Sequence, residues 1–150
     1  MTRNEARNLH ISTALVGLTG LVYAWMRYFA ESEDEFSLVS HPWQPELQAS
    51  HIITAPLLVF ACGLVWRAHV WLRVKSGFRP RRKTGLVLAV LLAPMIVSGY
   101  ALQVAVEELW RDVWIVTHVA SSVIWLLVYL VHQLAPRREA PVPAPAQEPD

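Results

Sequence analysis

The sequence predicts an all-α membrane protein in which four transmembrane helices form an up-down bundle. Three observations support this prediction. Of the 150 residues, 54% are hydrophobic and only 17% are charged. The hydrophobic residues gather in four blocks of about 20 residues, which is the length of helix that crosses a hydrocarbon layer of ~30 Å. The charged residues lie mostly between these blocks, so we expect one domain that covers residues 1–134.

Composition also excludes several classes of protein. The net charge of +1 gives no sign of nucleic-acid binding. The single cysteine, Cys62, allows no disulfide framework, and no C-x-x-C-H motif is present for covalent attachment of a c-type haem. The basic start and the first apolar block resemble a signal peptide, but the block ends in Trp25, Arg27 and Tyr28 without a cleavage site. We therefore expect this block to remain as the first helix.

The first helix is predicted at residues 9–29. One of its faces begins with a histidine and continues with small residues at a spacing of three and four. Small residues let membrane helices pack closely, and the same groove would also admit the flat edge of a porphyrin, so both interpretations stay open. The face consists of His10, Thr13, Gly17, Gly20 and Ala24.

Residues 30–48 form an acidic loop, in which two prolines indicate turns and His41 is interpreted as a loop histidine. The second helix is predicted at residues 48–72. It carries His51 near its start and His69 near its end, eighteen residues apart. This separation is five turns, so both histidines lie on one face of the helix, roughly 27 Å apart.

Residues 73–84 form a basic loop without an acidic residue. The third helix is predicted at residues 85–106 and has no histidine. Pro94 lies in its middle and is expected to kink it, with neighbouring helices or a cofactor satisfying the freed carbonyl. Gly99 either serves helix packing or lets a ring approach the backbone. We find no internal sequence repeat.

The fourth helix is predicted at residues 110–134, and it organises the chain. It carries His118 and His132, fourteen residues apart. This spacing places the two imidazoles about 40° apart around the helix and roughly 21 Å apart along it. Ionisable groups at membrane depth are costly and usually mark a functional site. Residues 135–150 are rich in proline and alanine and are expected to form a disordered cytoplasmic tail.

The basic residues predict the orientation. Eleven of the thirteen Lys and Arg residues lie at the N-terminus, around the loop between the second and third helices, or after the fourth helix. Only Arg27 and Arg111 lie on the other side. By the positive-inside rule, both termini are cytoplasmic and the acidic loop faces outward.

This orientation places four histidines in two pairs at matched depth. His51 and His118 form the outer pair, and His10 and His132 form the inner pair. Two neutral imidazoles saturate the axial positions of a haem iron, so the pairs predict a bundle that holds two haems and carries electrons. His69 is the alternative inner ligand, but it lies farther toward the headgroup level, and we favour His10.

The four histidines lie in the strings Asn8-Leu9-His10, Ser50-His51, Thr117-His118 and Val131-His132. In order, spacing and charge topology, the chain resembles the bacterial di-haem membrane cytochrome b family. This family comprises the cytochrome b subunits of respiratory formate dehydrogenase and nickel–iron hydrogenase, together with small stand-alone relatives. The resemblance covers residues 5–134. It implies two haem b groups, with His10 paired with His132 and His51 paired with His118 as axial ligands of the iron atoms.

The resemblance also implies a function. The chain would lie among the lipids of the bacterial inner (cytoplasmic) membrane and belong to a respiratory chain. It would carry electrons across the membrane between the quinone pool and a periplasmic redox partner, such as a c-type cytochrome or an iron–sulfur protein. We assign no catalytic residue. Whether the chain is itself a quinol/quinone oxidoreductase, and whether it forms a homo-oligomer, stays open.

Two other functions stay open as well. The first is a haem-free metal-binding membrane transporter or assembly factor, which would use the histidines for zinc or copper. Such sites need ligands that converge on one point, whereas the histidines here separate into two layers. The second is a membrane anchor for a soluble redox subunit.

Overall fold

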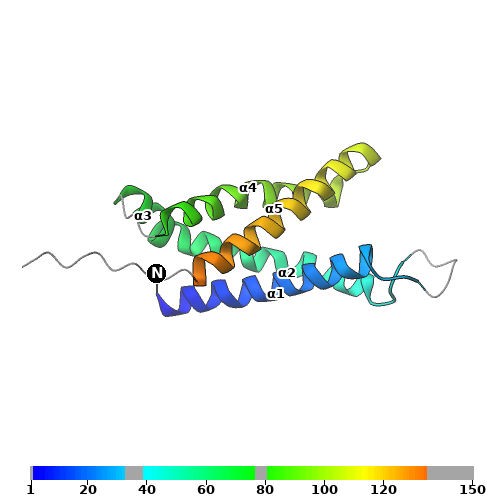
Figure 1. The fold of residues 1–150 in the computed structure, drawn as a ribbon, viewed down its shortest axis with the longest axis horizontal. Coiled ribbons are helices and arrows are strands. Elements are labelled where there is room, and N and C mark those ends of the chain that lie inside the picture. Colours follow the sequence, from blue (N-terminus) through cyan, green and yellow to red (C-terminus); the bar gives the residue numbers. More distant parts are fainter. Residues whose placement is uncertain (1, 33–38, 77–80, 135–150) are drawn as a thin grey trace, which may run out of the picture.

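The computed structural model describes residues 2–32, 39–76 and 81–134, and within these ranges the chain is helical nearly throughout, with no strand (Figure 1). The predicted tail at residues 135–150 and part of the predicted acidic loop lie outside the described residues. The elements in chain order are α1 (Arg3–Tyr28), α2 (Gln44–Val65), the π-helix η1 (Trp66–Trp71), α3 (Leu72–Lys75), α4 (Arg82–Val104) and α5 (Glu108–Leu134).

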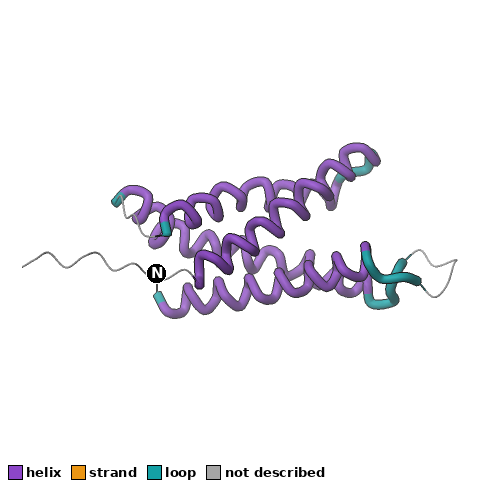
Figure 2. The backbone as a smooth tube through the Cα atoms, in the orientation of Figure 1, coloured by secondary structure: helices purple, strands orange, loops and turns teal. Residues whose placement is uncertain are grey.

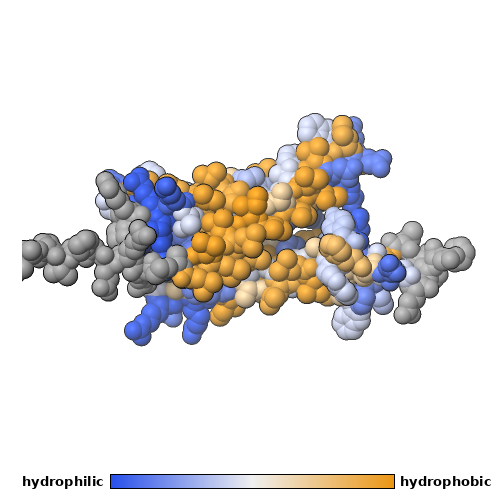
Figure 3. All heavy atoms as spheres, viewed as in Figure 1, coloured by the Kyte–Doolittle hydropathy of each residue, from blue (hydrophilic) through white to orange (hydrophobic). Residues whose placement is uncertain are grey.

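Four of these helices, α1, α2, α4 and α5, are long and apolar enough to cross a membrane. Many of their large apolar side chains point outward, among them Phe60 and Val90, which are 67% and 69% exposed. On the face in view, Figure 3 shows an apolar band across the middle of the molecule, with hydrophilic residues toward both ends. An outward apolar surface is what a helical bundle needs in lipid. The prediction of an all-α fold is confirmed, and the four candidate spans indicate a multi-pass membrane protein.

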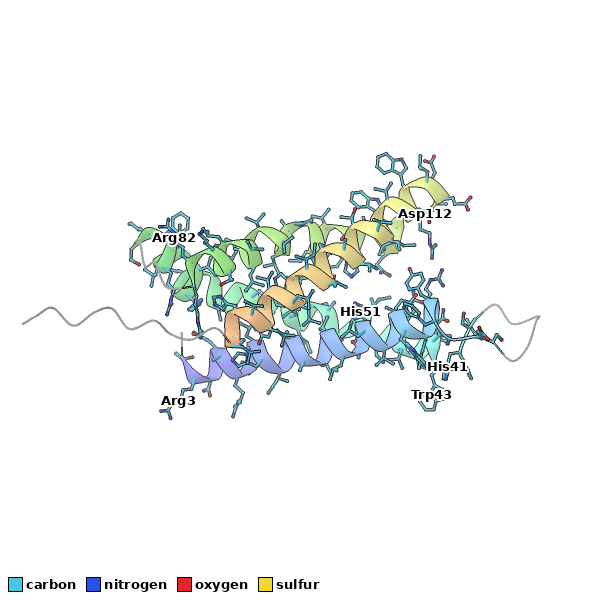
Figure 4. All side chains as sticks on the ribbon, in the orientation of Figure 1. Arg3, His41, Trp43, His51, Arg82 and Asp112 are labelled. Atoms are coloured by element: carbon cyan, nitrogen blue, oxygen red, sulfur yellow. The ribbon has the colours of Figure 1, made fainter. Side chains whose placement is uncertain are left out.

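The four long helices are arranged as two hairpins. Helix α1 packs against α2, and α4 packs against α5 (Figure 2). The starts of α1 and α4 and the end of α5 lie at one end of the bundle, which we call the N-terminal end. We call the opposite end the loop end. Figure 4 labels Arg3 and Arg82 at the N-terminal end, and His41 and Asp112 at the loop end.

A small core joins the hairpins. Trp125 and Tyr129 of α5 stack with ring centroids 5.3 Å apart and planes 11° apart. They form a buried cluster with Val16 of α1 and with Leu58 and Cys62 of α2. The cluster also reaches α4, because the Trp125 indole N–H donates a hydrogen bond to the Leu88 carbonyl (3.2 Å). One aromatic pair on α5 thus contacts both hairpins. Further residues of α1 and α4 that pack against the cluster are Leu9, Leu91, Leu92 and Met95.

Helix α1 begins at Arg3, earlier than the predicted residue 9, because its start is capped. The Thr2 hydroxyl accepts a hydrogen bond from the Glu5 backbone N–H (3.2 Å), and the Glu5 carboxylate accepts one from the Thr2 backbone N–H (2.7 Å). This capping box satisfies backbone donors that would otherwise be free at a helix start, so polar residues extend the helix beyond its apolar block.

The second hydrophobic block also differs from its predicted bounds. Helix α2 begins at Gln44 instead of residue 48, because Pro45 is favourable in the first turn of a helix. Regular α-helix ends at Val65, and the chain continues through η1 and α3 to Lys75. Helix α4, by contrast, continues as one helix from Arg82 to Val104 through Pro94, whose carbonyl accepts a hydrogen bond from the Ser98 hydroxyl (2.6 Å).

Candidate functional site

His51 of α2 and His118 of α5 face each other between the two hairpins. Their ring centroids are 6.2 Å apart and their planes are inclined by 75°. A bond between a metal and an imidazole nitrogen is about 2 Å long, so two imidazoles on opposite sides of one metal atom have centroids about 6 Å apart. The spacing of His51 and His118 therefore suits a single metal atom between the two rings. His51 is labelled in Figure 4.

A backbone carbonyl fixes the tautomer of each ring. His51 Nδ1 lies 3.1 Å from the Val16 carbonyl of α1, and His118 Nδ1 lies 3.0 Å from the Met95 carbonyl of α4. A carbonyl can only accept a hydrogen bond, so in both rings Nδ1 carries the hydrogen and donates it. The Nε2 atom of each neutral ring then keeps its lone pair. When Nδ1 donates a hydrogen bond in this way, Nε2 is the atom that binds a metal.

A hydroxyl oxygen also lies within hydrogen-bonding distance of each Nδ1 atom. Thr19 Oγ1 and Ser98 Oγ each lie 3.3 Å from the Nδ1 atom of His51 and His118, respectively. Each hydroxyl donates its own hydrogen to carbonyls of its own helix, with distances of 2.9 and 3.1 Å for Thr19 and 2.6 and 3.2 Å for Ser98. The hydroxyl oxygens are therefore left to accept from the imidazoles.

Two glycines let the rings lie against the neighbouring helix. A Cβ atom at Gly20 would lie 2.8 Å from His51 Cε1, and a Cβ atom at Gly99 would lie 3.0 Å from His118 Cε1. Both distances are too short for an ordinary contact, so a larger residue would push the imidazole away. The sequence suggested that these glycines serve helix packing or admit a ring, and the ring that each of them contacts is that of a histidine.

The two hairpins therefore build the site with the same local arrangement. In α1, the Val16 carbonyl, the Thr19 hydroxyl and Gly20 contact His51. In α4, the carbonyl, hydroxyl and glycine at the same spacing contact His118; these are Met95, Ser98 and Gly99. The sequence pattern pointed to Gly20 and Gly99, but it showed no repeat and did not point to Val16, Thr19, Met95 or Ser98. The one sequence feature that the two hairpins share here is a hydroxyl residue followed by glycine in the first helix of each, and this feature is too common to identify the site by itself.

A cavity of about 300 Å³ adjoins the histidine pair. It lies between the hairpins, and in Figure 3 a hollow opens between them toward the loop end. Its lining is mainly apolar and draws on α1, α2, α4 and α5. The lining includes Gly17, Gly20, Gly99, His51 and His118, together with Arg27 and Arg111. The small residues predicted on the first helix thus border a space beside the two imidazoles.

His132 meets a similar arrangement at the N-terminal end. The Thr84 hydroxyl lies 2.8 Å from His132 Nδ1 and donates its own hydrogen to the Arg81 carbonyl (3.0 Å). It can therefore accept from Nδ1, which again leaves the lone pair on Nε2. The next residue is Gly85, whose Cβ position lies 3.6 Å from His132 Cε1. A hydroxyl–glycine pair of α4 thus contacts each histidine of α5.

His10 is hydrogen-bonded through Nδ1 to the hydroxyl of Tyr129, with ring centroids 6.1 Å apart. Among the described residues, His10 and His132 share no hydrogen bond or ring contact. His69 lies in η1 at the same end of the bundle. Burial lowers the pKa of His69 below its usual value, and the positive charge of Arg73 lowers it further. The structure thus brings the predicted outer pair together and places three histidines at the N-terminal end.

His41 has a local role. Its Nδ1 atom accepts a hydrogen bond from the Trp43 backbone N–H (3.2 Å), in the turn that leads into α2. This contact agrees with its interpretation as a loop histidine.

In the part of the chain that the structure describes, no group of three or more His, Cys, Asp or Glu side chains is arranged to hold a metal ion. A metal atom between His51 and His118 would need its other ligands from a cofactor.

Comparison of the chain with models of known protein families, with curated proteins and with solved structures found no match.

Proposed function

We propose that the chain is a di-haem b-type cytochrome that carries electrons across a membrane. One observation carries this proposal: His51 and His118 face each other at 6.2 Å, with both Nδ1 atoms hydrogen-bonded to backbone carbonyls. In this arrangement each ring keeps a lone pair on Nε2, and the two rings would together hold one iron atom. A porphyrin supplies the remaining ligands, so no third protein ligand is needed.

The residues around the pair fit a haem. Gly20 and Gly99 keep the two imidazoles close to α1 and α4, and the apolar cavity beside them extends between the hairpins. The haem, when bound, supplies an iron atom that accepts and releases single electrons. The protein orients the two ligands, and the apolar lining keeps water away from them. With His51 and His118 both bound to its iron, such a haem would suit electron transfer and not the binding of oxygen or substrate.

For the second haem we propose His132 as one ligand and His10 as the other, with His69 as the alternative to His10. The Nδ1 atom of His132 is hydrogen-bonded to Thr84, and that of His10 to Tyr129. A ligand histidine usually has such a partner on its other ring nitrogen. This shared feature favours His10 over His69.

The direction of the bundle follows from the charges. We propose that the basic N-terminal end faces the cytoplasm and that the loop end faces outward, in a bacterial inner membrane. Electrons would then pass between the quinone pool and a periplasmic redox protein that docks at the loop end. This function is the one implied by the resemblance to the di-haem membrane cytochromes b.

A spectrum of the purified, full-length chain with a count of haem and metal tests the proposal. We expect two haem b per chain and the absorption bands of low-spin, six-coordinate iron in both oxidation states. Purified chain that carries zinc or copper without iron would support the alternative, a haem-free metal transporter or assembly factor, and would contradict the proposal.

A further inference from the structure

Two arginines lie at the loop end of the cavity that adjoins the histidine pair. Arg27 belongs to the last turn of α1, and Arg111 belongs to the first turn of α5. Both line the same cavity as His51 and His118. The sequence has thirteen Lys and Arg residues, and these two are the ones that its charge pattern places at the loop end. Both of these cations thus border one cavity.

The register of the two helices directs both arginines toward this cavity. Arg27 follows Gly20 by seven residues, and Arg111 precedes His118 by seven residues. Seven residues are about two turns, which returns to the same helix face within about 20° and rises about 10.5 Å. Gly20 contacts His51, so its face of α1 is the one that borders the site. Each hairpin therefore places one guanidinium about two turns from the imidazole pair, toward the loop end.

Among the described residues, neither arginine has a partner that explains its position. The side chains of Arg27 and Arg111 form no hydrogen bond or ion pair with a described residue, and both are exposed. Cations near a membrane surface are favoured on the cytoplasmic side, so the positive-inside rule gives no reason for arginines at the loop end. A mainly apolar cavity bordered by two cations that pair with no described residue suits an apolar ligand with negative groups at its end toward the loops.

We propose that Arg27 and Arg111 bind the two carboxylates of the ligand in this cavity. This inference rests on the proposed function, under which the ligand is haem and the carboxylates are its propionates. A guanidinium binds a carboxylate through two parallel hydrogen bonds, which lysine cannot reproduce. The pair would keep both carboxylates out of the hydrocarbon layer, where charges are costly. It would also set the orientation of the haem in its plane, with the propionate edge toward the loop end.

The test compares haem b with its dimethyl ester, in which both carboxylates are uncharged. Apoprotein is titrated with each compound, and binding is followed by the absorption bands of six-coordinate iron. The titration is made with the wild-type chain and with the His132→Ala chain. Because the substitution removes a proposed ligand of the other haem, the second titration measures binding at the loop end alone. A charge-assisted hydrogen bond is worth at least ~1.4 kcal/mol, or about tenfold in affinity, so two carboxylates predict a preference for haem b of about 100-fold.

Variants connect this preference to the two arginines. Arg27→Gln and Arg111→Gln are each expected to lower the preference about tenfold, and the double variant is expected to abolish it. Arg27→Lys should retain part of the preference, because lysine keeps the charge and loses the paired hydrogen bonds. The matched control is Arg67→Gln, since Arg67 lies in η1 outside this cavity and should leave the preference unchanged.

The possible outcomes separate the two proposals. A wild-type chain that binds neither compound with a six-coordinate spectrum overturns both the haem function and this inference. A chain that binds both compounds equally well keeps the haem function and overturns the assignment of the arginines. If the glutamine variants keep the preference but lose binding to vesicles of anionic phospholipid, the arginines bind lipid headgroups, and the inference is wrong.

Discussion

Gly20 of α1 lies so close to His51 of α2 that a Cβ atom at Gly20 would be 2.8 Å from the Cε1 atom of the imidazole. The two helices form one hairpin, and the ring occupies the space that a side chain would need. The position of His51 in the proposed haem site therefore depends on the absence of a side chain on the neighbouring helix. Gly99 and His118 repeat this relationship in the second hairpin at 3.0 Å.

We expect Gly20→Ala to lower the affinity of the haem at the loop end by at least tenfold, because the added methyl group displaces His51 from its position. Gly99→Ala should act in the same way through His118. The measurement is the haem count of each purified variant. Gly63→Ala is the matched control, because a Cβ atom at Gly63 meets nothing within 4 Å. A Gly20→Ala chain with full haem content would contradict the role of this close contact.

Loss of the Thr19 hydroxyl and loss of the Ser98 hydroxyl should weaken the binding of the same haem. Thr19→Val and Ser98→Ala each remove one acceptor from an Nδ1 atom while the carbonyl of Val16 or Met95 remains. We expect each variant to weaken haem binding by up to about tenfold, the lower part of the range for a group that orients a metal ligand. We also expect a shift in the midpoint potential of the same haem, which potentiometric titration would show.

Conservative variants provide the control for these hydroxyls. Thr19→Ser and Ser98→Thr keep the acceptor and should restore both the affinity and the potential. If Thr19→Val shifts the haem at one end of the bundle and Ser98→Ala shifts the haem at the other end, the two hairpins do not share one site.

Single histidine variants should each lose one haem, and which haem is lost should assign each histidine to one of the two sites. His51→Ala and His118→Ala are expected to remove the same haem, whereas His132→Ala removes the other. Each loss should be nearly complete, because the remaining axial ligand binds haem much more weakly than the pair. The haem count and the spectrum of the remaining haem measure the result. His41→Ala should retain both haems, since His41 contacts the turn before α2.

Tyr129→Phe tests which histidine pairs with His132. The variant removes the hydroxyl that is hydrogen-bonded to His10 and keeps the aromatic ring that stacks on Trp125. With His10 as the ligand, we expect about a tenfold or greater loss of affinity at the N-terminal end and little change at the loop end. Unchanged haem binding at both ends, together with haem loss in His69→Ala, would assign His69 as the ligand instead.

Much of the architecture could be predicted from the sequence. Hydrophobic blocks of spanning length predict four helices, and the depth of each histidine depends only on its position along its helix. The matched depth of His51 and His118 was predicted in this way, and the two rings do face each other. The pairing of His10 with His132 had the same basis and stays a prediction, since depth alone does not determine which rings approach.

The surroundings of the histidines could not be predicted, because they depend on the rotation of one helix against another. Val16 and Met95 contribute backbone carbonyls, so the identity of their side chains gives no signal. Thr19 and Ser98 resemble the many hydroxyl residues that bond to their own helix in a membrane. The π-helix that carries His69 also had no clear signal, since hydropathy is unaffected by a change in hydrogen-bond register.

In the proposed cytochrome, one iron atom is bound between His51 and His118. Low-temperature electron paramagnetic resonance of the oxidised, full-length chain tests it most directly, when wild type is compared with His118→Gly before and after addition of free imidazole. We expect the low-spin signal of one haem to disappear in the variant and to return when imidazole fills the position of the missing ring. A wild-type chain without a low-spin haem signal, or a variant whose signals match those of wild type, would contradict the claim.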